Sequence, residues 1–245
     1  MNKAKPWIIA HRGSSGEFPE NTLAAFWDAV KSQADIIEMD LQLTADEQVV
    51  AFHDTIVDRI FQERSGKKID DFSLFELKQK EIGSWFDPKF EGLRIPILME
   101  VLENLPQDTS LILELKSNKV KLLESVIQTL EVMNKSLGLG YISVRDIETY
   151  KTCKEISSKH KIGLMQKKRT PKETIEEVVK NEIEIVQIRW KNWKPDEWKR
   201  IEDLDVIVTA FSADERSDFE FLVDKKIDGI HTNYPKRLYE FLNKE

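Results

Sequence analysis

The chain of 245 residues contains a single cysteine, Cys153, and no long apolar run. One cysteine excludes an internal disulfide and is typical of a protein in a reducing compartment. No stretch approaches the ~20 consecutive apolar residues that a membrane-spanning helix requires, and the polar residues 1–6 contain no signal-peptide core. These absences predict a cytoplasmic protein without stable membrane insertion.

An excess of basic residues is also absent. The chain has 37 Lys and Arg against 44 Asp and Glu, both signs are interspersed, and the net charge is −7. Nucleic-acid-binding domains usually collect Lys and Arg on one face, and this sequence has no such basic stripe. We therefore expect a small-molecule partner and no nucleic acid, while the oligomeric state is left open.

The order of apolar runs predicts the fold. Short apolar runs alternate with amphipathic segments along most of the chain, which indicates a parallel sheet covered by helices. Eight such units predict a closed (β/α)₈ TIM-type barrel, a fold of about this length, in one domain over residues 1–245. The predicted strands are 7–10, 35–41, 110–115, 141–144, 162–165, 183–188, 205–210 and 229–231.

Residues 55–95 interrupt this alternation. Their periodicity is poor and polar residues dominate, although segment 70–82 predicts a short helix before the aromatic pair Trp85 and Phe86. The stretch is too long for a simple loop. It is therefore interpreted as a small insertion after the second strand and its hairpin.

Two carboxylates share one face of the second predicted strand. Glu38 and Asp40 are two residues apart, so their side chains point the same way, and such a pair needs a cation if both stay ionised when partly buried. Only four residues separate Leu43 from Gln48, which predicts an antiparallel hairpin. With Leu43 facing Gln48, the register places His53 opposite Glu38.

Polar side chains gather where three predicted strands end, and TIM barrels build their active sites at these ends. They are His11, Arg12, Glu38, Asp40, Glu114 and Lys116. The three acids offer only oxygen ligands, which suit Ca²⁺ or Mg²⁺ better than zinc. We expect one divalent cation there; the alternative is that each acid pairs with a neighbouring Lys or Arg.

The remaining residues of the cluster suit phosphate chemistry. The imidazoles of His11 and His53 can act as acid or base near neutral pH. Arg12 offers a planar fork to phosphate oxygens and Lys116 a point charge, although a solvated position at the barrel rim is the alternative for Lys116. His160, before the strand 162–165, is expected at the surface.

Five motifs in this order resemble the glycerophosphodiester phosphodiesterases of the PLC-like phosphodiesterase superfamily. They are HRG at 11–13, PENT at 19–22, ExD at 38–40, HD at 53–54 and ELK at 114–116. Near the C-terminus, FSAD (211–214) and KIDGIHTNYP (226–235) resemble that family's last turn and closing strand. The resemblance extends over nearly the whole chain.

The resemblance implies a metal-dependent hydrolase that cleaves glycerophosphodiesters to glycerol 3-phosphate and an alcohol. It assigns His11 as base and His53 as acid, and it makes Arg12 and Lys116 phosphate contacts. It also assigns the metal ligands, which are Glu38, Asp40 and Glu114. Attack by water and attack by the substrate's own glycerol hydroxyl, through a cyclic intermediate, are both open.

The chain departs from the family pattern at three positions. Asn233 stands where an aspartate is usual, Phe211 where a tryptophan is usual, and Asp214 where an asparagine is usual. We expect these departures to bear on substrate preference and not on the reaction. The possible pocket residues are Asn21, Trp190, Phe211 and His231.

Some assignments have alternatives. Asn21 can instead cap the helix at 23–31, and Trp190 can pack between helices. A related enzyme acting on lysophospholipids, a lysophospholipase D, would use Trp85 and Phe86 to accept an acyl chain. A protein of a different class would be a catalytically silent barrel that binds phosphodiesters.

Overall fold

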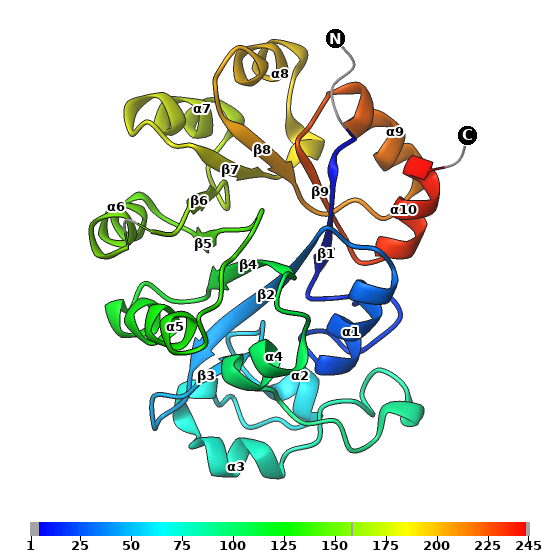
Figure 1. The fold of residues 1–245 in the computed structure, drawn as a ribbon, viewed down its shortest axis with the longest axis vertical. Helices are drawn as coiled ribbons and strands as arrows, with labels where there is room; N and C mark the ends of the chain where they lie inside the picture. Colours follow the sequence, from blue (N-terminus) through cyan, green and yellow to red (C-terminus); the bar gives the residue numbers. More distant parts are fainter. Residues whose placement is uncertain (1–4, 158, 244–245) are drawn as a thin grey trace.

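The computed structural model, which describes residues 5–157 and 159–243, is a closed barrel of eight parallel strands (Figure 1). The strands follow the order β1-β9-β8-β7-β6-β5-β4-β2, and β1 pairs with β2 to close the ring. The (β/α)₈ prediction is confirmed. The barrel strands are β1 (Trp7–His11), β2 (Ile36–Leu43), β4 (Ser110–Leu115), β5 (Ile142–Val144), β6 (Ile162–Met165), β7 (Ile185–Ile188), β8 (Ile207–Ala210) and β9 (Gly229–Thr232).

Helices surround the strands in Figure 1. Three of them begin at a residue that caps the helix: the side chains of Thr22, Asp146 and Thr170 accept backbone N–H bonds at the starts of α1, α6 and α7, as N-cap residues do. No helix of the described residues has the length and apolar character needed to cross a membrane. The surrounding helices are α1 (Leu23–Lys31), α4 (Leu98–Asn104), α5 (Val120–Val132), α6 (Ile147–Ile156), α7 (Pro171–Lys180), α8 (Pro195–Glu202), α9 (Arg216–Asp224) and α10 (Pro235–Asn243).

The two faces of the barrel strands have different partners. Residues of one parity, such as Ile8 and Ile37, belong to the large core shared with the helices. Residues of the other parity form a separate cluster that includes Ile9, Ile36 and Ile112. Because side chains alternate along a strand, the polar residues two positions further on face the barrel interior, above this apolar layer. They include His11, Glu38 and Glu114.

The hairpin after β2 is shifted by one residue from the predicted register. Leu43 pairs with Val49 in β3 (Val49–Ala51), not with Gln48, because Thr44 and Gln48 bond to each other across the turn. His53 therefore lies beyond the end of β3 and not opposite Glu38. The predicted pairing was wrong in detail, although the hairpin and its direction are confirmed.

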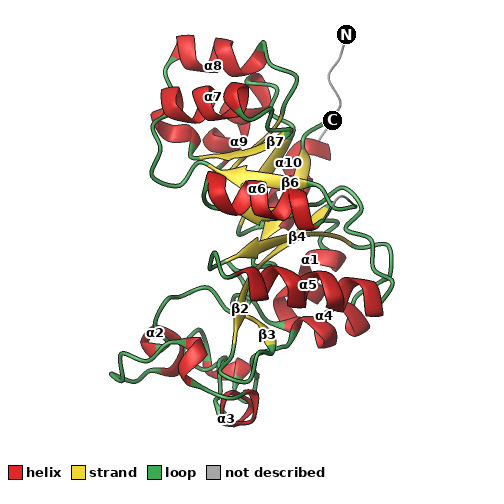
Figure 2. Ribbon diagram, turned by 90° about the vertical axis from the view of Figure 1, so that its left-hand side faces the viewer, coloured by secondary structure: helices red, strands yellow, loops and turns green. Residues whose placement is uncertain are grey.

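The insertion has a hydrophobic cluster of its own, which includes Ile60, Phe72 and Leu77. The single helix expected at 70–82 is wrong, because one short element ends at Asp71 and Ser73 begins the next through a capping box. Figure 2 shows α2 and α3 beside β3 at one end of the molecule. The elements are α2 (Asp58–Phe61), η1 (Ile69–Asp71), α3 (Leu74–Gln79) and η2 (Pro88–Phe90).

Candidate active site

The first loop of the site turns sharply after β1. Arg12 has a φ of 58° and Gly13 a φ of 80°. A Cβ on Gly13 would lie 2.6 Å from the backbone carbon of Ala25 in α1, so only glycine fits there. The turn points the Arg12 N–H at Glu38, whose Oε2 accepts it at 2.8 Å.

Three buried carboxylates converge, as the sequence predicted. One oxygen each of Glu38, Asp40 and Glu114 lies within 4.8 Å of the others. Asp40 and Glu114 are direct register partners in β2 and β4, so the sheet itself sets their spacing. This is a compact, all-oxygen group of donors.

Three cations contact these carboxylates. Lys116 Nζ lies 2.9 Å from Asp40 and 3.1 Å from Glu114, and Arg12 Nε lies 3.2 Å from Asp40. The third, Arg145, donates to Glu114 at 2.6 Å and was not identified from the sequence. The sequence did indicate a site position for Arg145, because it directly follows β5, at the same strand end as the other site residues.

The pKa shifts of the acids differ because their partners differ. Burial, followed by the charges of Asp40 and Glu114, raises the pKa of Glu38 well above its usual range. Burial also opposes ionisation of Asp40, but Lys116 and Arg12 hold its pKa far below the ordinary value. Glu38 accepts the Arg12 backbone N–H but has no ion pair with a described side chain. A divalent cation would supply that missing charge, so the donor set fits Ca²⁺ or Mg²⁺.

The orientation of His11 is fixed from the far end of the chain. Asn233 Nδ2 donates to Asp214 at 2.7 Å, so the Asn233 carbonyl oxygen must face His11 Nδ1 at 2.8 Å. That oxygen can only accept. The hydrogen of a neutral His11 is therefore on Nδ1, and Nε2 has a free lone pair. Burial and the Arg12 charge lower the pKa of His11, which favours this neutral form.

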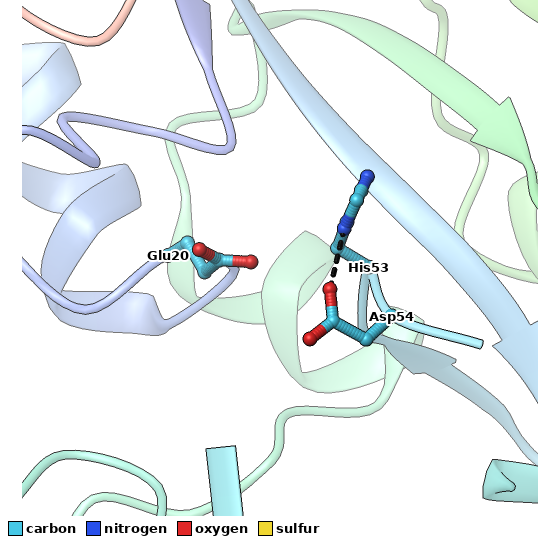
Figure 3. A group of neighbouring side chains, drawn as sticks. All are labelled: Glu20, His53 and Asp54. Atoms are coloured by element: carbon cyan, nitrogen blue, oxygen red, sulfur yellow. Dashed lines mark hydrogen bonds and ion pairs between the residues drawn. The ribbon is translucent and has the colours of Figure 1, made fainter. Parts of the chain in front are cut away.

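The second histidine has an acidic partner. Asp54 Oδ1 lies 2.7 Å from His53 Nδ1, and the other ring nitrogen points away from Asp54 (Figure 3). Burial would raise the pKa of Asp54, but hydrogen bonds from His53 and Arg59 hold it well below its usual range. Asp54 thus remains a carboxylate, and Nδ1 of His53 is a donor.

A cavity of about 730 Å³ adjoins His53 and Lys116. Twelve of its fourteen lining residues have polar or charged side chains, and Leu43 and Ile56 are the aliphatic exceptions. The full lining is Gln42, Leu43, His53, Asp54, Thr55, Ile56, Asp58, Arg59, Lys68, Asp70, Lys116, Ser117, Lys119 and Arg145. Trp85 and Phe86 do not line it; their rings pack against each other with centroids 5.7 Å apart.

The expected pocket residues lie elsewhere. Asn21 is buried, donates to Asp40 at 2.8 Å and accepts the Asp40 N–H at 3.1 Å, whereas Thr22 caps α1. The alternative of Asn21 as a cap is therefore wrong. Trp190 is buried, and the centre of its ring lies 5.3 Å from that of Phe221 in α9. This contact agrees with the alternative in which Trp190 packs against a helix instead of lining the pocket.

The fourth histidine is enclosed in the barrel. His231 is fully buried, and its Nε2 lies 3.3 Å from the Thr209 hydroxyl. Phe211 packs at its edge, with ring centroids 6.4 Å apart. Burial and the nearby His11 lower the pKa of His231 well below the usual value, so it is a neutral part of the barrel interior. Neither His231 nor Phe211 lines the cavity beside His53.

The fold and the site define a class: a TIM-barrel hydrolase whose acidic cluster, able to hold a metal ion, adjoins two histidines. The model of the glycerophosphoryl diester phosphodiesterase family matches residues 11–237. The chain belongs to this family of phosphoric diester hydrolases.

Individual relatives agree with this membership. A glycerophosphodiester phosphodiesterase of Caldanaerobacter subterraneus is 31% identical over 98% of this chain and 99% of its own length. A putative glycerophosphodiester phosphodiesterase of Bacillus subtilis is 48% identical, over 58% of this chain and 55% of that protein. The structure of an Oleispira antarctica phosphodiesterase, in complex with the product sn-glycerol-3-phosphate, has a TM-score of 0.87, 24% identity and 98% coverage of both chains.

Proposed function

We propose that this protein hydrolyses glycerophosphodiesters to glycerol 3-phosphate and an alcohol, with one divalent cation in the acidic cluster. The observation that carries the proposal is that buried Glu38 forms no ion pair with a side chain of the described residues while lying within reach of Asp40 and Glu114. The cation, Ca²⁺ or Mg²⁺, would be held by these three carboxylates and would stabilise negative charge on the phosphate. Family membership and the product found in the Oleispira antarctica phosphodiesterase support the choice of substrate.

The two histidines have complementary roles in this proposal. His11, with its hydrogen on Nδ1, takes a proton at Nε2 from the attacking oxygen. His53, supported by Asp54, donates the Nε2 proton to the alcohol oxygen as the P–O bond breaks. Arg12 and Lys116 lie beside the acidic cluster and offset charge on the phosphate oxygens.

The cavity beside His53 indicates the kind of alcohol. The leaving alcohol must lie near the acid that protonates it, so it would occupy this cavity. A small polar alcohol fits this cavity, because only Leu43 and Ile56 are aliphatic among the lining residues. A lysophospholipid carries its acyl chain on the glycerol side of the phosphate, where the chain needs an apolar surface. Trp85 and Phe86, the aromatic pair expected to accept such a chain, pack against each other and do not line the cavity, so a glycerophosphodiester fits better than a lysophospholipid.

This choice can be tested by comparing two substrates with the same choline headgroup. We expect kcat/KM for glycerophosphocholine to exceed that for monomeric lysophosphatidylcholine by at least ~10-fold, which corresponds to ~1.4 kcal/mol. Release of choline from both substrates measures it. A preference for the lysophospholipid would instead assign the protein to the lysophospholipase D activity of a human relative, which is 34% identical over 52% of this chain.

The pair Asn233 and Asp214 predicts a reciprocal rescue. Asn233→Asp alone would place two carboxylates 2.7 Å apart, and Asp214→Asn alone would remove the acceptor that orients the Asn233 amide. Either change should lower kcat about 10-fold through a misplaced His11. The double exchange restores one acid and one amide, so kcat should return to within about 3-fold, a coupling of the size seen between contacting residues. Additive losses in the double variant would show that the pair does not act on His11.

A further inference from the structure

One arginine of the insertion joins the two loops that carry acidic residues at the site. Arg59 of α2 donates from Nε to Asp54 at 2.7 Å, and its Nη2 lies 3.1 Å from the other Asp54 oxygen. The same guanidinium donates to Glu20 from Nη2 at 2.7 Å and from Nη1 at 3.1 Å. Figure 3 shows Glu20 apart from the bonded pair His53 and Asp54, and Arg59 contacts both carboxylates at 2.7 Å.

The contacts continue from both acids into the site. On one side, Asp54 bonds His53 Nδ1. On the other side, Glu20 accepts from Arg12 at 3.0 Å, and Arg12 Nε lies 3.2 Å from Asp40. A continuous chain of charged contacts thus runs from His53 through the insertion to the acidic cluster.

The position of Arg59 is itself fixed by packing. Its guanidinium carbon lies 4.9 Å from the centre of the Trp85 ring. Trp85 packs against Phe86, Phe86 against Phe90, and Phe90 against Phe18, with the last two centroids 5.3 Å apart. Phe18 belongs to the same loop as Glu20, so aromatic and ionic contacts hold the insertion to that loop together.

These contacts have the geometry needed to orient an acid. A bidentate arginine–carboxylate pair fixes the plane of the carboxylate, and Asp54 in turn fixes the ring of His53. Removal of Arg59 would leave Asp54 free to rotate and Glu20 facing it as a like charge. His53 would then lose a fixed direction for its Nε2.

We propose that Arg59 is a positioning residue that holds His53, through Asp54, in the orientation needed to protonate the leaving alcohol. The inference rests on the proposed acid role of His53. It gives the insertion a part in the chemical step: α2 supplies the residue that aligns the acid.

The test uses the leaving group. An alkoxide leaving group requires the proton from His53, whereas para-nitrophenolate is a stable anion that leaves without one. We expect Arg59→Met to lower kcat for glycerophosphocholine about 10- to 100-fold, the cost of a misaligned catalytic group. For the para-nitrophenyl ester of glycerol 3-phosphate, the same variant should keep kcat within about 3-fold, because acid catalysis no longer limits the rate.

Matched variants separate the explanations. Arg59→Lys keeps the charge but not the fork, and should recover part of the loss on glycerophosphocholine. Arg64→Met, at an exposed arginine of the insertion without hydrogen bonds or ion pairs in the described part of the chain, should change neither rate. Equal losses by Arg59→Met on both substrates, or no loss on either, would overturn the proposal.

The same comparison of the two substrates, made with His53→Ala, tests the assumption that His53 is the acid. A loss confined to glycerophosphocholine supports His53 as the acid. Equal losses on both substrates would overturn the acid role and, with it, the role of Arg59. A selective loss in His53→Ala without one in Arg59→Met would overturn the positioning role alone.

Discussion

Replacement of either site histidine by alanine is expected to lower kcat on glycerophosphocholine at least ~10²-fold, the low end for general acid–base catalysis. For His11 the reason is geometric: Asn233 accepts its Nδ1 hydrogen, which leaves Nε2 as the base. For His53 the reason is its acidic partner. Asp54 accepts the Nδ1 hydrogen and so supports the protonated ring, which donates its Nε2 proton to the leaving alcohol.

The matched control is His160→Ala, at the histidine predicted to be at the surface. His160 is partly exposed, and among the described residues its ring bonds the nearby Ser157 hydroxyl at 2.7 Å. His160→Ala should leave kcat unchanged, and this result would show that loss of an imidazole alone does not impair the protein. Near-normal turnover in His11→Ala or His53→Ala would remove that residue from the proposed mechanism.

The second large effect is expected from Glu38→Gln, which removes one negative charge from the acidic cluster and keeps the shape of the side chain. We expect Ca²⁺ or Mg²⁺ to bind at least ~100-fold more weakly, because the charge count of the ligands sets cation affinity. Isothermal titration calorimetry measures this without reference to turnover. Glu124→Gln, on the exposed side of α5, is the control.

The same variant should have the opposite effect on the cation-free protein. The pKa of Glu38 is raised in the folded state, so the folded state binds more protons than the unfolded state, and stability falls as pH rises above the unfolded pKa of about 4.3. Glu38→Gln removes this penalty. At neutral pH it should raise the Tm of the cation-free protein and abolish the rise in Tm that added cation causes. Unchanged cation affinity would contradict the assignment of Glu38 as a ligand.

The sequence predicted the parts of the site that depend on strand periodicity. Glu38, Asp40 and Glu114 converge because each lies on the inward parity of its strand, and parity can be read from spacing alone. His11, Arg12, His53 and Lys116 were located by the motifs that resemble the family and, for all but His53, by their position at predicted strand ends. The barrel followed from the alternation of apolar runs.

Contacts that depend on loop geometry could not be predicted. The register of the hairpin shifted by one residue because Thr44 and Gln48 bond across the turn. Arg59 lies in an irregular segment where no periodicity indicates a direction for its side chain. Asn233 and Asp214 were noted only as separate departures from the family pattern, because their contact requires the closed barrel.

The central claim is that a divalent cation in the acidic cluster supports hydrolysis of glycerophosphodiesters. Its most direct test is release of glycerol 3-phosphate from glycerophosphocholine and glycerophosphoethanolamine, with Ca²⁺, with Mg²⁺ and with a chelator. We predict turnover with at least one cation and its loss with the chelator. Turnover that persists in the chelator would contradict the metal site, and no release from either substrate with either cation would contradict the proposed reaction.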